Sequence, residues 1–270
     1  MGLKNLIKNI FNSGQKTPNP VLTKKERLQA YSVENLSLNL KKNIPVFVYQ
    51  MGKVASSTIY SSIKKQYNGL TFHGHNFREG MTDDLLKRFF HEYQNNKFEI
   101  KLISLVREPV SRNLSAFFEN FKRDVGIDYK DSEYNPTDLL NIFLENYNHD
   151  IPLNWYDKNF KSAFGIDVFD YEFPKEGYIL INRENVSVLL MKHDLNNELK
   201  EKIVGEFIDI PNFKLKNANV STSKEYADSY NEVKKLKLPE TYIDRMLNSK
   251  YAQHFYKNEI EQIKSKLINK

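Results

Sequence analysis

The 270-residue chain contains no cysteine and no long apolar run. The absence of cysteine excludes disulfide bonds and thiolate metal sites, and it favours a reducing compartment such as the cytoplasm. No stretch approaches the roughly 20 apolar residues that a membrane-spanning helix needs. The phosphate-binding signature of nucleotide hydrolases, G-x-x-x-x-G-K-[ST], is also missing. The chain therefore lacks the sequence markers of a disulfide-stabilised, a membrane-spanning or a Walker-type protein.

The composition is that of a globular protein with a positive charge. Apolar residues make up 40% of the chain and aromatic residues 13%, which is enough to form a core. The formal net charge of +6 favours anionic partners: nucleotides, acidic glycans, nucleic acid or anionic lipid. The lysines are scattered among glutamates and aspartates rather than gathered in a stripe with aromatic residues. A nucleic-acid partner is therefore not expected.

The first 22 residues form an amphipathic segment followed by a linker. Leu3, Leu6, Ile7, Ile10 and Phe11 have helical spacing, and "GQKTPNP" is rich in turn formers. The segment is too short and too interrupted for a secretory signal. It is a candidate for peripheral contact with the inner face of the cytoplasmic membrane, and the alternatives are packing on the protein body or disorder.

Strand-like and helix-like stretches alternate through the rest of the chain. Strands are expected at residues 45–49, 69–73, 101–106 and 177–182, and helices at 56–67, 81–93, 108–123 and 186–195. The chain from residue 223 onward is expected to be mostly helical. This alternation predicts one α/β domain over residues 23–270, with a parallel sheet flanked by helices. Residues 126–174 break the pattern and are expected to form an irregular insertion, either a lobe over the sheet edge or a surface segment.

A candidate phosphate-binding loop, "QMGKVASST", follows the first strand. Gly52 permits a sharp turn and a close approach of the backbone to a ligand, and Lys53 adds a charge. The N–H groups of the following helix favour an anion. The residues expected to bind the phosphate-bearing ligand are Gly52, Lys53, Ala55, Ser56, Ser57 and Thr58. In a Walker loop the lysine and the hydroxyl residue are adjacent and hold Mg²⁺ together, whereas here they are separated, so protein cations are expected to neutralise the phosphate without a metal.

A second anion site is predicted in "SLVREPVSRNLSAFF". Arg107 ends a buried strand, and Ser115 lies on the helix that begins near Pro109. Arg112 has two alternatives: contact with the same phosphate, or an ion pair with Glu108. Two anion sites on two strands imply a ligand with two separate phosphate groups.

Together the two motifs resemble those of the sulfotransferase superfamily, whose donor is 3′-phosphoadenosine 5′-phosphosulfate (PAPS). "QMGKVASST" is similar to the 5′-phosphosulfate loop, and "VREPVSRNLSAFF" is similar to the 3′-phosphate motif, with Arg107 and Ser115 at the expected spacing. The resemblance covers about residues 45–116, and it implies a P-loop-like fold, PAPS as donor and transfer without a metal.

Two further stretches resemble carbohydrate sulfotransferases. "TFHGHNF" is similar to the His-Gly-His stretch of uronosyl 2-O-sulfotransferases, and this likeness implies that His75 is the catalytic base. The C-terminal "KEYADSY" and "YAQHFYKNEI" resemble tails of bacterial capsule-type enzymes. The resemblance thus implies a carbohydrate acceptor and a role in polysaccharide biosynthesis.

The histidines support the same assignment on chemical grounds. His73 and His75 stand at the end of a strand, where α/β sheets bind their ligands, and imidazole is a suitable base near neutral pH. No carboxylate or cysteine cluster accompanies the pair, so no metal site is expected. His91, His149, His193 and His254 lie in helix-like or polar stretches and are expected to be surface or capping residues.

Further candidate residues lie near residue 224 and in the segment 126–174. Ser223 and Lys224 lie where related enzymes close a loop over the nucleotide, although Ser223 is equally consistent with a helix cap. Trp155 and Tyr156, with His73, are candidates for acceptor binding, and the alternative for a lone tryptophan is a buried anchor.

The rival functions are a metal-dependent P-loop kinase and a non-enzymatic module that binds acidic glycan or nucleic acid.

Overall fold

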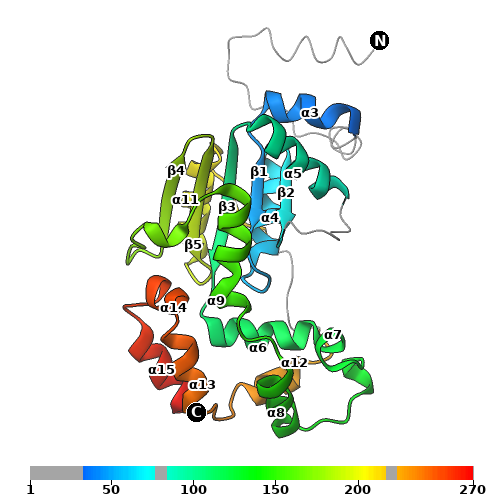
Figure 1. Cartoon of the computed structure of the whole chain (residues 1–270), viewed down its shortest axis with the longest axis vertical. Coiled ribbons are helices and arrows are strands. Elements are labelled where there is room, and N and C mark those ends of the chain that lie inside the picture. Colours follow the sequence, from blue (N-terminus) through cyan, green and yellow to red (C-terminus); the bar gives the residue numbers. More distant parts are fainter. Residues whose placement is uncertain (1–32, 77–83, 217–223, 270) are drawn as a thin grey trace.

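A five-stranded sheet forms the centre of the fold (Figure 1). The computed structural model describes residues 33–76, 84–216 and 224–269. The strands are β1 (Val46–Tyr49), β2 (Thr71–Gly74), β3 (Ile100–Val106), β4 (Tyr178–Arg183) and β5 (Val186–Lys192). They lie in the order β2-β1-β3-β5-β4, with β4 antiparallel to β5 and all other pairs parallel. The expected α/β class is confirmed.

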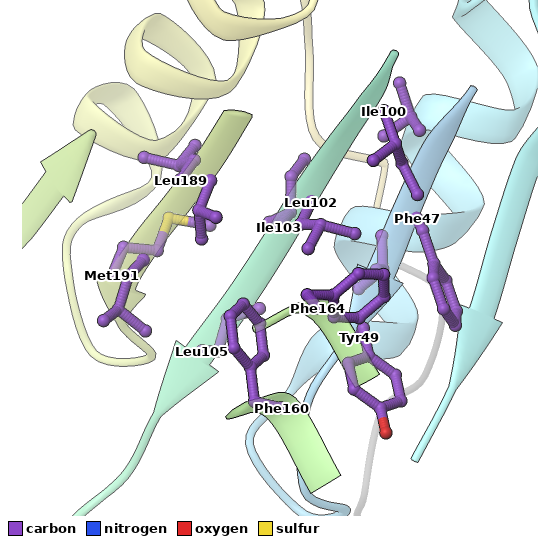
Figure 2. Close-up of a cluster of buried hydrophobic side chains, with 14 of the residues drawn as sticks. Phe47, Tyr49, Ile100, Leu102, Ile103, Leu105, Phe160, Phe164, Leu189 and Met191 are labelled. Carbon is purple, nitrogen blue, oxygen red and sulfur yellow. The ribbon is translucent and has the colours of Figure 1, made fainter. Parts of the chain in front are cut away.

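Apolar side chains pack on both faces of the sheet. On one face, Phe47 and Tyr49 of β1 pack against Phe160 and Phe164 (Figure 2). Alternation along the strand directs Val46 and Val48 to the opposite face, and all four residues of β1 are buried. Strands that are buried on both faces read as continuous apolar runs. This explains why "VFVY" and "KLISLV" show no polar alternation.

The stretch expected as a helix at residues 186–195 is instead β5, so that prediction is wrong. The run is only seven residues long and rich in apolar and β-branched side chains, a pattern that fits a buried strand as well as a helix. β5 pairs in register with β3, from Ile100 opposite Val186 to Val106 opposite Lys192. It also forms a tight hairpin with β4 around Glu184, which has a positive φ of 51°. The strand expected at 177–182 is therefore present, but it is an antiparallel edge strand.

Residues 126–174 are mostly helical rather than irregular. They contain η1 (Tyr129–Asp131), α8 (Pro136–Asn146), α9 (Ile151–Trp155), the π-helix η2 (Tyr156–Lys161), α10 (Ser162–Phe164) and η3 (Val168–Asp170). Trp155, Tyr156 and Phe160 are buried in the main apolar cluster with the sheet. These residues therefore supply part of the main core, while α8 contributes to a second apolar cluster.

The helices fall into two groups. α4 (Ser56–Gln66), α5 (Asp84–Asn96) and α11 (Asn197–Phe207) belong with the sheet. A second apolar cluster joins α8 to α6 (Pro109–Glu119), α7 (Phe121–Val125), α12 (Ala227–Val233), α13 (Glu240–Leu247) and α15 (Ile260–Ile268), while α14 (Lys250–Phe255) packs against the main cluster. Figure 1 shows this helical layer beyond the carboxyl ends of the parallel strands. The expected helical C-terminal region is confirmed.

Only part of the N-terminal region can be compared with its predictions, because the described residues begin at residue 33. The first helix described is α3 (Val33–Lys42). Residues 1–22, including the amphipathic stretch at 3–11, lie outside the described residues, so membrane contact stays a prediction. Within the described ranges, no helix combines the length and apolar character that a bilayer span requires.

Candidate active site

Four parallel strands deliver polar side chains to one edge of the sheet. β1 leads into the loop that contains Lys53, β2 carries His73 and is followed by His75, β3 is followed by Arg107, and β5 by His193. The carboxyl edge of a parallel sheet is where α/β proteins bind their ligands. The candidate site is therefore this edge, on the side of the helical layer.

The loop after β1 turns at positions that the sequence did not indicate. The turn was expected at Gly52, but the residues with positive φ are Lys53 (72°) and Ala55 (59°). A left-handed conformation is unfavourable for residues with a Cβ, and strained residues of this kind cluster at functional sites. A Cβ added at Gly52 would meet no atom within 4 Å, so the glycine leaves open space beside the loop. Ala55 is the N-cap of α4 and provides no side-chain cap, which suits the helix start for an anion.

This loop geometry gives a stability prediction. Ala55→Gly should raise the free energy of unfolding by about 1 kcal/mol, because glycine adopts positive φ without strain and is a better N-cap than alanine. Gly52→Ala should leave stability unchanged, since it enters open space. Denaturant unfolding of the two variants measures both effects. Gly165→Ala is the matched control, because φ is 71° at Gly165 and strain should lower stability there.

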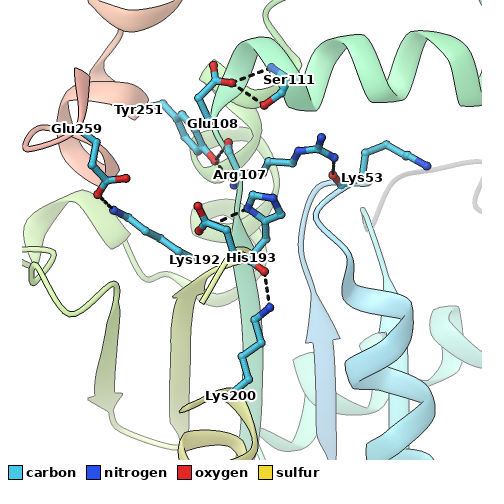
Figure 3. A network of polar contacts seen from close by, with 10 residues as sticks. Lys53, Arg107, Glu108, Ser111, Lys192, His193, Lys200, Tyr251 and Glu259 are labelled. Carbon is cyan, nitrogen blue, oxygen red and sulfur yellow. Dashed lines mark hydrogen bonds and ion pairs between the residues drawn. The ribbon is translucent and has the colours of Figure 1, made fainter. Parts of the chain in front are cut away.

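Two arginines bind the backbone of the same loop. Arg107 Nη1 donates to the carbonyl oxygen of Lys53 at 3.0 Å, and Arg112 Nε donates to that of Gly52 at 3.0 Å. The hydroxyl of Tyr251 accepts from the N–H of Arg107 at 3.1 Å and donates to its carbonyl oxygen at 2.9 Å (Figure 3). The structure thus brings together the two strand ends at Lys53 and Arg107.

Arg112 is a buried cation with neutral partners. Its side chain also donates to the Tyr147 hydroxyl at 2.8 Å and to Asn113 Oδ1 at 3.1 Å. In the described part of the chain no carboxylate forms an ion pair with it, because Glu108 instead caps α6. Burial lowers the pKa of Arg112, Tyr147 opposes this effect, and the charge of Arg107 adds to it. The ion pair with Glu108 is therefore absent, whereas contact of Arg112 with the phosphate stays a prediction; the buried charge makes the loop more attractive to an anion.

Lys53 extends away from Arg107 to a carboxylate on α6. Its Nζ lies 3.2 Å from Glu119 Oε2, and the same oxygen accepts from Lys224 Nζ and the Tyr226 hydroxyl. Burial lowers the pKa of Lys53, while Glu119 opposes that shift. Burial raises the pKa of Glu119, but hydrogen bonds from Lys224 and Tyr226 and the charge of Lys53 outweigh it and bring the pKa to about 2. Lys224 therefore lies beside Lys53, whereas Ser223 falls outside the described residues.

His73 and His75 point to the same side of β2, as residues two apart on a strand do. Ser56 Oγ and Gln50 Nε2 lie 3.0 and 3.3 Å from His73 Nε2. Nδ1 of His75 lies 2.8 Å from the carbonyl oxygen of Gln50, so it carries the proton and donates. The free lone pair of the imidazole is then on Nε2, so Nε2 can accept a proton, as a base must.

The surroundings keep both imidazoles neutral. Burial, followed by the charge of His75, lowers the pKa of His73 to about 4. Desolvation on the protein-facing side of His75 also lowers its pKa, the hydrogen bond to Gln50 opposes this, and the charge of Arg112 adds to it. The residue as a whole is exposed, so its outer edge is open to an incoming group. His75 is thus a base that remains unprotonated below the usual range of histidine.

The hydroxyl residues of the loop are not equivalent. Ser56 is buried, and its hydroxyl lies 2.5 Å from Gln50 Nε2, so it belongs to the histidine network rather than to open space. Ser57 is exposed, and Thr58 is half-buried in the first turn of α4. Ser115 is half-buried on α6.

Trp155 and Tyr156 are corrected from acceptor-binding to core residues. Trp155 is 5% exposed and Tyr156 is 2% exposed, so neither ring can stack on a sugar. Trp155 donates from Nε1 to the carbonyl oxygen of His75 at 2.8 Å, and the Tyr156 hydroxyl lies 3.0 Å from Ser104 Oγ. The buried tryptophan therefore holds the backbone of His75 in place through this hydrogen bond.

Sequence reasoning missed five residues of this site: Gln50, Glu119, His193, Tyr226 and Tyr251. Gln50, a polar residue directly after an apolar strand, could have been found by its position. Tyr251 lies on α14 and Tyr226 directly precedes α12; both belong to the C-terminal stretches that resemble capsule-type tails, but their contacts with Arg107 and Glu119 span 144 and 107 residues and gave no local signal. His193 was assigned to the surface because its strand was taken for a helix. His149, expected at the surface or as a cap, is buried against Tyr242, and its Nε2 lies 2.9 Å from the carbonyl oxygen of Phe143 in the last turn of α8, as the capping alternative predicts.

Comparison with known proteins gives one match. The family model NKWYS, described as "putative capsular polysaccharide synthesis protein", matches residues 124–257. Trp155, His193, Lys224 and Tyr251 lie in the matched segment, while the loop after β1 precedes it. The match points to a capsular polysaccharide-related family. No curated protein and no solved structure matches the chain.

Proposed function

We propose that this protein transfers the sulfuryl group of PAPS to a hydroxyl of a carbohydrate acceptor. The observation that carries the proposal is the convergence of Lys53 and Arg107 from two strand ends, with Arg107 bound to the backbone of Lys53. The Nζ of Lys53 and the guanidinium of Arg107 lie on opposite sides of that backbone (Figure 3). Two separated cations suit a ligand with two separate anionic groups, such as a 3′,5′-bisphosphorylated adenosine.

Each residue of the candidate site has its own role in the proposed sulfuryl transfer. His75 Nε2 removes the proton of the acceptor hydroxyl, and its Nδ1–H remains fixed by Gln50. Lys53 and the N–H groups at the start of α4 stabilise the charge that develops on the departing 5′-phosphate. Arg107, with Ser115, holds the 3′-phosphate and so selects this donor over ATP. The S–O bond to the 5′-phosphate breaks as the bond to the acceptor oxygen forms.

The capsular polysaccharide match supports a glycan as acceptor. A cytoplasmic enzyme that contacts the inner membrane face through residues 3–11 would meet such a glycan during its synthesis. An acceptor screen with radiolabelled donor tests this part: transfer of label to acidic polysaccharide is expected. Transfer only to small alcohols would contradict it.

Calorimetric titration with adenosine 3′,5′-bisphosphate in EDTA tests the donor assignment. A dissociation constant on the order of micromolar is expected without magnesium. Binding of ATP that requires Mg²⁺ would support the kinase alternative instead. If neither nucleotide binds while an acidic glycan does, the protein is a binding module and the proposal is wrong.

A further inference from the structure

His193 occupies a defined place beside Arg107. β5 runs parallel to β3 with Val106 opposite Lys192, and the N–H of His193 donates to the carbonyl oxygen of Val106 at 2.9 Å. His193 is thus the first residue beyond β5, as Arg107 is the first beyond β3. Figure 3 shows the His193 ring next to the Arg107 side chain.

The side chains of His193 and Arg107 each have a buried nitrogen that makes no hydrogen bond within the described residues. His193 Nδ1 and Arg107 Nε are buried and have no hydrogen-bond partner among the described residues. Asp194 Oδ1 approaches His193 Nδ1 only to 3.8 Å. Unpaired buried polar atoms are costly, and at a ligand site they indicate where a ligand supplies the missing partner.

The charges around the imidazole come from several elements. Arg107 faces it from β3, Lys200 from α11 and Asp194 from its own loop. Lys200 Nζ donates to the carbonyl oxygen of His193, and nearby Lys192 is paired with Glu259 before α15. Burial, followed by the charge of Arg107, lowers the pKa of His193 to about 4, so the imidazole is neutral near pH 7.

We propose that His193 binds the same phosphate as Arg107 and takes up a proton from solvent when that phosphate arrives. This inference rests on the proposed function and names a further donor-binding residue. A phosphate dianion reverses the local potential, because it adds two negative charges beside an imidazole that the positive charges of Arg107 and Lys200 otherwise keep neutral. The imidazolium then donates a hydrogen bond to the phosphate. His193 and Arg107 together thus select a ligand with a phosphate monoester on the 3′ position of its ribose.

The sign of the pH effect follows from this uptake. Above about pH 6.5 the phosphate is already a dianion, so its own protonation does not contribute. Affinity should therefore fall as pH rises from about 6.5 to 8.5, by up to about tenfold per unit if one proton is bound. A ligand without a 3′-phosphate should show no such dependence on His193.

Calorimetry at pH 7.5 in two buffers with different ionisation enthalpies measures the proton uptake directly. The wild-type protein should take up close to one proton more with adenosine 3′,5′-bisphosphate than with adenosine 5′-monophosphate. His193→Asn should abolish that difference and weaken binding of the bisphosphate about tenfold. His91→Asn is the matched control, because His91 is exposed on α5 and should leave the uptake unchanged.

Each outcome separates the two proposals. Undiminished proton uptake in His193→Asn, with bisphosphate binding intact, would overturn the role of His193 and leave the donor assignment standing. Absence of bisphosphate binding by the wild-type protein would overturn the donor assignment and this inference with it. Thermal unfolding, together with His193→Gln as a second variant, distinguishes loss of the ligand contact from loss of the fold.

Discussion

Replacing His75 by alanine is expected to slow sulfuryl transfer by about 10²–10⁴-fold while affinity for adenosine 3′,5′-bisphosphate stays unchanged. The imidazole has the tautomer that proton abstraction requires, since Nδ1 donates to the carbonyl oxygen of Gln50. A single-turnover assay with labelled donor measures the rate, and calorimetry measures the affinity. His91→Ala provides the surface control.

The pH profile gives an independent check on the same residue. Burial lowers the pKa of His75, so the base form persists to a lower pH than it would for a free imidazole. The rate should stay on its plateau as pH falls through about 6.5, the usual histidine value, and decline only below it. A near-native rate for His75→Ala, or a decline that begins above pH 7, would contradict the assignment of the base.

Replacing Arg107 by alanine is expected to weaken binding of adenosine 3′,5′-bisphosphate by on the order of 2–4 kcal/mol, or roughly 30- to 1,000-fold. The substitution removes the contact with the 3′-phosphate and also the hydrogen bond to the Lys53 carbonyl oxygen. Arg107→Lys keeps the charge but loses the planar fork, so it should recover only part of the affinity. Calorimetric titration of both variants measures the difference.

The comparison of ligands identifies which role of Arg107 dominates. A residue that binds the 3′-phosphate should matter far more for the bisphosphate than for adenosine 5′-monophosphate. If both ligands lose affinity equally, Arg107 acts by positioning the loop alone, and the assignment of the 3′-phosphate to it is wrong.

The fold class was predictable because each βα unit carries its own local signal. An apolar run followed by glycine or proline and then an amphipathic stretch marks β1 with α4 and β3 with α6. The error at residues 186–195 has a physical origin: the short, mostly apolar stretch fits both periodicities, and it becomes a strand through its pairing with β3 and β4. Because β5 was missed, His193 was missed with it.

Residues near strand ends could be placed at the candidate site from the sequence, whereas contacts that span the chain could not. Lys53, His75 and Arg107 all stand within a few residues of a strand end, and the sheet brings such positions together. The contact between Arg112 and Gly52 spans 60 residues and that between Lys224 and Glu119 spans 105, so neither leaves a local pattern. Burial of Trp155 likewise depends on tertiary packing.

Glu119 on α6 pairs with both Lys53 and Lys224. This single carboxylate offsets one of their two positive charges before any nucleotide binds. An incoming nucleotide phosphate must displace this carboxylate from the lysines. The measured affinity is therefore the difference between the free energies with which the lysines bind the phosphate and Glu119. Such an exchange releases few salt ions, and it should therefore respond to ionic strength less steeply than the number of cations at the site suggests.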